Sequence, residues 1–74
     1  MMPEPTYEIY RVVKIKITED NWTSLITDLS YYEEVPLETL RDLHVDQHIG
    51  NWVEVVRYLP GGPSPTARIV RTHE

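Results

Sequence analysis

A chain of 74 residues without a single cysteine has no covalent cross-link, so it must fold on the strength of its hydrophobic core alone. The same absence excludes a thiolate zinc site and an iron–sulfur cluster. A chain of this length builds one compact domain and buries only about 60% of the surface that its unfolded form exposes. We expect residues 7–74 to form that domain, and we expect the proline-broken residues 1–6 to be a flexible N-terminal arm.

The hydropathy pattern is that of a soluble protein. Apolar residues make up 41% of the chain and charged residues 26%, which is an ordinary globular balance. Apolar runs are four residues long or shorter, whereas a membrane-spanning helix needs about 20 residues and the core of a secretory signal peptide roughly 7–15. The sequence therefore predicts a soluble protein, which we expect in the cytoplasm.

Charge is distributed unevenly along the chain. Residues 19–46 contain eight acids and one base, for a net charge of −7, while the other residues contain six bases and four acids, for +2. The total of −5 argues against non-specific binding to duplex DNA, which depends on neutralising phosphates. The uneven distribution predicts a molecule with two electrically different sides, one suited to a basic partner and one to an acidic partner.

The first half of the chain predicts a strand and a helix. The alternation over residues 7–17 indicates a half-buried strand, interrupted in its pattern by Arg11, one side of which carries Tyr7, Ile9, Val13, Ile15 and Ile17. Helix-start chemistry follows at residues 18–20. The next apolar residues have helical spacing and predict a helix that ends near Tyr32; they are Trp22, Leu25, Ile26 and Leu29.

The second half predicts another helix and two strands. Pro36 is tolerated in a first helical turn, and the leucines after it predict a helix from about Val35 to His44. Residues 52–59 have the composition of a strand, the proline- and glycine-rich residues 60–65 form a loop, and residues 66–72 form the antiparallel partner strand. The expected fold is α+β, in the order β-α-α-β-β, with a three-stranded antiparallel sheet and two short helices.

A winged helix-turn-helix is the alternative fold. Ile49, Trp52, Val53 and Val56 also have helical spacing, so residues 48–59 would be a recognition helix and the loop at 60–65 its wing. In this reading Val45 takes the buried position of the turn. Against it, Gly50 would lie inside the helix at a cost of about 1 kcal/mol relative to alanine, and Arg57 would be its one cation.

Catalytic and metal-binding patterns are poor in this chain. His44 and His48 have the spacing of a metal-binding helix, but a third ligand would have to come from Asp42 or His73, and we expect these histidines at the surface instead. The serines lack the glycine-rich surroundings of a nucleophile, and Gly61-Gly62 lacks the lysine and helix of a phosphate loop. We therefore expect no enzyme activity, no metal and no cofactor.

Cationic and aromatic residues are the remaining candidates for function. Lys14 and Lys16 share a strand face with Tyr10 beside them, and Arg68 would join them if the last strand paired with the first; such a face suits single-stranded nucleic acid, or is simply a solvated sheet face. We expect Trp22 and Trp52 nearly to fill a core of this size, which leaves the tyrosines as exposed, rigid contact area. The candidate partner-binding residues are Tyr10, Arg11, Lys14, Lys16, Tyr31, Tyr32, Glu33, Glu34, Glu38, Tyr58 and Arg68.

In size, acidity, lack of cysteine and expected α+β fold, the chain resembles small phage-encoded proteins that take over host machinery, and it is similar in character to phage transcription regulators that bind bacterial RNA polymerase. The resemblance concerns the whole chain and assigns a role to no residue. It implies a cytoplasmic, non-enzymatic regulator that binds the polymerase and inhibits initiation or alters termination, with nucleic acid nearby but not tightly bound. Two alternatives stay open: a winged-helix DNA-binding regulator, and an acidic decoy that inhibits a nuclease or another nucleic-acid-binding protein.

Overall fold

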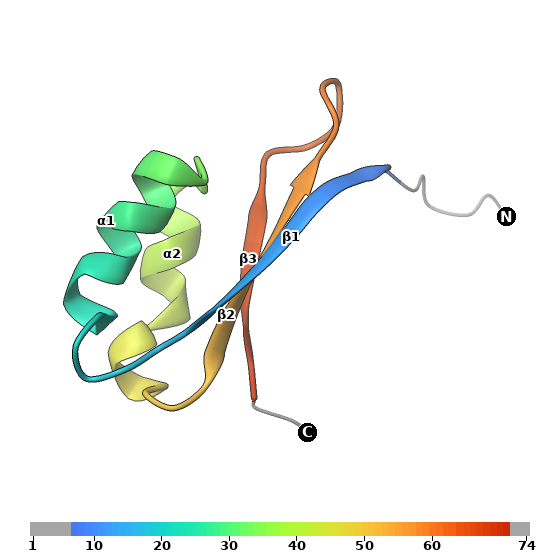
Figure 1. Ribbon diagram of the computed structural model, residues 1–74. Coiled ribbons are helices and arrows are strands. Elements are labelled where there is room, and N and C mark those ends of the chain that lie inside the picture. Colours follow the sequence, from blue (N-terminus) through green and yellow to red (C-terminus); the bar gives the residue numbers. More distant parts are fainter. Residues whose placement is uncertain (1–6, 72–74) are drawn as a thin grey trace, which may run out of the picture.

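The two helices of this protein lie on the same face of a three-stranded antiparallel sheet (Figure 1). The structure is a computed structural model that describes residues 7–71. Its elements in chain order are β1 (Ile9–Lys16), α1 (Trp22–Tyr32), α2 (Leu37–Leu43), a 3-10 turn η1 (Val45–Gln47), β2 (Trp52–Tyr58) and β3 (Thr66–Val70). The expected β-α-α-β-β order is confirmed. The arm expected at residues 1–6 lies outside the described residues.

The central strand of the sheet is β2, which pairs with β1 on one side and β3 on the other. A winged-helix fold would need a helix here, so that alternative is wrong. Gly50 has a φ of +100°, which stops helical winding, and its N–H donates to the Ile17 carbonyl over 2.8 Å. The chain then alternates as a strand, with Val53 and Val55 both buried. Val45 is also buried, as the turn of the alternative fold required, but no recognition helix follows it in the described chain.

A bulge at Tyr10 interrupts the pairing of β1 with β2. Ile9 lies opposite Tyr58 and Arg11 opposite Arg57, so Tyr10 is the extra residue. Because a one-residue shift reverses the faces of a strand, Ile9 joins the uncovered face and is 54% exposed. The expectation that Tyr7 and Ile9 share the buried side of Val13 is therefore wrong, whereas the part after the bulge follows the predicted alternation.

The start of α1 is fixed by a reciprocal pair of hydrogen bonds. The Thr18 N–H donates to Oδ1 of Asn21 over 2.8 Å, and the Asn21 N–H donates to Oγ1 of Thr18 over 3.1 Å. Asn21 Nδ2 also donates to the Lys16 carbonyl over 2.8 Å. These bonds satisfy backbone groups at the helix start, and they join the end of β1 to α1.

The second helix, α2, is shorter than predicted because non-helical residues precede and follow it. Glu34 has a φ of 60°, and Pro36 is extended with a ψ of 138°, so the helix begins at Leu37 instead of Val35. His44 has a φ of 53°, and this left-handed conformation ends the helix at Leu43.

One hydrophobic core lies between the helices and the covered sheet face. Its members are buried aliphatic side chains from both helices, η1, β2 and the turns that join the elements: Ile17, Leu25, Leu29, Val35, Leu40, Val45, Val53 and Val55. Within residues 7–71 no charged or polar side chain is buried with them. In the same residues no helix is long and apolar enough to cross a membrane. Among the described elements, the helices cover one face of the sheet and nothing covers the other.

The left-handed conformation of His44 gives a test of this fold. Non-glycine residues in this conformation are strained, so we expect His44→Gly to raise the free energy of unfolding by about 0.5–1 kcal/mol. The measurement is urea unfolding followed by circular dichroism. The control is Arg41→Gly, an exposed position inside α2, which should lower stability by about 0.5–1 kcal/mol. Equal losses in the two variants would contradict a strained turn at His44.

Candidate macromolecule-binding surfaces

The described residues offer surfaces instead of an enclosed active site. Among residues 7–71 no group of three or more histidine, cysteine, aspartate or glutamate residues could hold a metal ion. His44 and His48 do not share a helix face, because the left-handed turn at His44 and the 3-10 turn η1 separate them. His73, the other ligand considered, lies outside the described residues.

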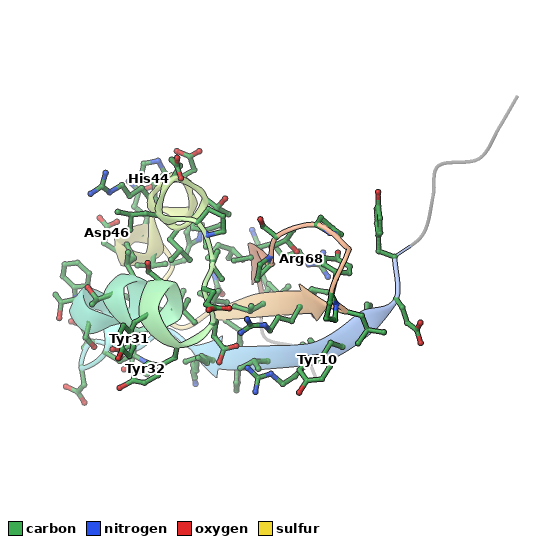
Figure 2. All side chains as sticks on the ribbon, turned by 90° about the horizontal axis from the view of Figure 1, so that it is seen from above. Tyr10, Tyr31, Tyr32, His44, Asp46 and Arg68 are labelled. Atoms are coloured by element: carbon green, nitrogen blue, oxygen red, sulfur yellow. The ribbon has the colours of Figure 1, made fainter. Side chains whose placement is uncertain are left out.

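The predicted partner-binding residues occupy separate parts of the molecule. Figure 2 shows Tyr31 and Tyr32 together on α1, Tyr10 on β1 well away from them, and Arg68 on another side of the molecule. Tyr10, Arg11 and Tyr58 come together at one end of the sheet. Lys14, Lys16 and Arg68 lie on its uncovered face, and Glu38 lies on α2.

An open groove of about 650 Å³ crosses the end of β1 and β2. We call it the strand-end groove; it is lined by Tyr10, Arg11, Arg57, Tyr58, Leu59 and Pro60. Tyr10 is 63% exposed. Tyr58 packs edge to face against Tyr7, with ring centroids 6.2 Å apart. Two arginines, the exposed Tyr10 and the half-buried Tyr58 give the groove the composition of a protein contact surface.

Four charged residues connect this groove to the C-terminal end of α1. The Arg11 guanidinium lies 2.6 Å from Oε1 of Glu33, whose side chain is only 15% exposed, and Arg57 lies 3.8 Å from the same oxygen. Arg57 also pairs with Glu34. The carboxylate of Glu33 is thus engaged within the chain, and a partner would reach it only by displacing arginines, whereas the Glu34 side chain is 69% exposed and stays accessible beside its ion pair.

The uncovered side of the sheet, which we call the open face, carries cross-strand rows of side chains. The register places Lys16, Trp52 and Val70 in one row and Lys14, Glu54 and Arg68 in the next. Glu54 lies 2.7 Å from Arg68 and 4.0 Å from Lys14. Arg68 therefore shares a face with the lysines. It does so without the expected pairing of the last strand with the first, because β2 lies between β1 and β3.

The opposite side of the molecule is acidic. We define the acidic layer as six exposed carboxylates on the helices and their turns, which make no ion pair within the described residues: Glu19, Asp20, Asp28, Glu38, Asp42 and Asp46. Arg41 is the one base on these elements. Every other arginine and lysine belongs to the sheet strands or, for Arg71, follows β3 directly. The two-sided charge expected from the sequence is thus a property of the folded chain.

Tyr31 and Tyr32 form a separate aromatic patch at the end of α1. Their rings meet edge to face, with centroids 4.8 Å apart, and they are 74% and 68% exposed. Tyr31 lines a shallow hollow of about 510 Å³ together with Glu34 and Leu37. These rings are as accessible as predicted, but they do not join the tyrosines of the strand-end groove.

Three residues that line surface hollows were not among the predicted partner-binding residues: Trp52, Arg57 and Arg71. Trp52 was expected to fill the core, yet strand parity places it on the open face, opposite Lys16. Alternation of Val53 and Val55 with Trp52 and Glu54 contained that signal. Arg57 has the strand parity of Val53 and Val55, and the register places it opposite Arg11 at the end of the sheet.

No protein-family model, no curated protein and no solved structure matches this chain.

The ion pairs at the end of α1 give a stability test. We expect Glu33→Gln to lower the free energy of unfolding by about 1 kcal/mol, since the carboxylate is partly buried and contacts two arginines. Glu38→Gln is the matched control, because Glu38 makes no ion pair within the described chain. Urea unfolding at low salt and at 1 M NaCl measures both variants. Equal free energies of unfolding for the two variants at low salt would contradict a stabilising role of these ion pairs, whereas a partly buried pair should lose only part of the difference at 1 M NaCl.

Proposed function

We propose that this protein is a small, non-enzymatic regulator that acts by binding bacterial RNA polymerase and thereby inhibits initiation or alters termination. The observation that carries the proposal is the separation of charge between the acidic layer and the sheet. Such a molecule presents one side to a basic surface and leaves a cationic side for an acidic one. A polymerase partner would place the protein in the cytoplasm of a bacterial cell.

The acidic layer is the side suited to a protein partner. Its six carboxylates are exposed and lack ion pairs within the described residues, so they are available to arginines and lysines of another protein. Enzymes that handle nucleic acid have basic surfaces where phosphates bind. An acidic protein that docks on such a surface competes with the nucleic acid or changes its path.

Aromatic surface next to the acidic layer supplies contact area. Tyr31 and Tyr32 lie on α1, within the helical layer, and tyrosine contributes rigid surface at low entropic cost. The strand-end groove adds Tyr10, Arg11 and Tyr58 as a second contact. Long-range attraction by the carboxylates would speed association, and the aromatic contacts would determine how long the complex lasts.

The first experiment is capture of RNA polymerase by the tagged protein from nuclease-treated bacterial lysate, followed by binding and transcription assays with purified polymerase. We expect the core subunits to be recovered and transcription to change in proportion to occupancy. If purified polymerase neither binds the wild-type protein nor changes its transcription, the proposal is wrong.

A pair of charge variants tests the side that makes the contact. Glu38→Gln with Asp42→Asn removes two negative charges from the acidic layer, and we expect the affinity for polymerase to fall at least fivefold. Ser64→Lys with Thr66→Lys raises the net charge equally at exposed positions on the sheet side, and we expect less than a twofold change. Equal losses would show that net charge, not the acidic layer, determines binding.

An acidic decoy is the second candidate function, and the carboxylates of α2 favour it. Glu38 and Asp42 are exposed one helical turn apart, and Asp46 follows in η1 (Figure 2 labels Asp46). A decoy imitates the negative charge of nucleic acid, so it would bind a nuclease or another nucleic-acid-binding protein and would itself have no affinity for nucleic acid. Lys14→Glu with Lys16→Glu should leave decoy activity intact.

A further inference from the structure

We propose that the open face binds single-stranded nucleic acid, with one base stacked on Trp52 and the backbone phosphates against Lys16, Lys14 and Arg71. This inference goes beyond the proposed regulator, because it assigns a second ligand to the side opposite the acidic layer. The inference stands or falls independently of polymerase binding, because it is tested with a free oligonucleotide and the protein alone.

The position of Trp52 is the first part of the argument. Trp52 lies on the central strand with Lys16 on one side and Val70 on the other, and its side chain is half-buried. Trp52 also lines a hollow of about 230 Å³ together with Lys14, Val70 and Arg71. This volume is below the roughly 300–1,000 Å³ of pockets for drug-sized ligands, and it suits a single planar ring.

The charges around Trp52 identify the ligand. Lys14, Lys16, Arg68 and Arg71 surround it, and Glu54 is the one acid in the two rows. Lys16 and Arg71 have no ion-pair partner within residues 7–71, so they are available for phosphates. An aromatic ring between free cations is how proteins bind single strands, because unpaired bases stack on the ring while the backbone follows the charges. A duplex keeps its bases stacked inside and offers no ring to Trp52.

Glu54 sets the strength of this site. Its carboxylate holds Arg68 at 2.7 Å and Lys14 at 4.0 Å, which neutralises part of the face. The single strand therefore meets two free cations and two that are shared with Glu54. Neutralising Glu54 would release both shared cations to phosphates, and this predicts a gain of affinity that a folding defect cannot produce.

The two tryptophans of the chain make the site directly measurable. Trp22→Phe leaves Trp52 as the one tryptophan, and we expect its fluorescence to be quenched when a 12-residue oligothymidylate is added at low salt. Trp52→Phe leaves Trp22, the first residue of α1, which is partly buried against the core. In that variant we expect no quenching, and affinity measured by anisotropy of a labelled oligonucleotide at least fivefold lower than wild type.

Glu54→Gln is the decisive variant. We expect it to bind the oligonucleotide several-fold more tightly than wild type, with a steeper dependence of log affinity on log salt, since each added phosphate contact adds about 0.7 to the slope for a single strand. Lys16→Gln should weaken binding and make that slope shallower.

Three results would overturn the inference. The first is unchanged Trp52 fluorescence with no anisotropy signal at low salt. The second is equal affinity in wild type and Trp52→Phe, which would mean that no base stacks there. The third is equally tight competition by poly-glutamate of the same length, which would assign the face to an acidic peptide.

Discussion

Burial of one small apolar core on one face of a three-stranded sheet is the constraint from which the rest of the molecule follows. Ile17, Leu40 and Val53 are completely buried, and burial of each such side chain contributes about 1.5–3 kcal/mol. Both helices of residues 7–71 lie on that one face, so no described element covers the other. The side chains of the outer face therefore do not pack in the core, and they are available for contacts with other molecules.

The same constraint separates the charges. Helices that cover a sheet show their outer side to water, and in this chain that side carries the carboxylates of the acidic layer. The cations are placed on strands, where the register brings several of them into neighbouring rows around Glu54. At the end of the sheet, Glu33 and Glu34 from α1 meet Arg11 and Arg57. Opposite charges thus pair at the boundary of the two layers and around Glu54, whereas the carboxylates of the acidic layer make no ion pair within residues 7–71.

Sequence patterns predicted the elements well, because alternation and helical spacing depend on the core face alone. The strand at 52–59 was chosen over a helix from its valines, and Val53 and Val55 are buried as a strand requires. Three features were not predictable. The bulge at Tyr10 reverses the face of Ile9 without any change in composition, and the conformation of Glu34 delays α2. The grouping of surface residues also depended on strand order, which local patterns do not contain.

The bulge at Tyr10 has a further consequence, which concerns how copies of the protein behave toward one another. β1 is an edge strand of eight residues, and a straight edge of that length is a template on which other strands add and aggregates grow. A bulge bends and twists the edge, and Lys14 and Lys16 bring like charges together when two such edges approach. The irregularity in the first strand therefore makes this edge of the sheet a poorer template for the addition of another strand.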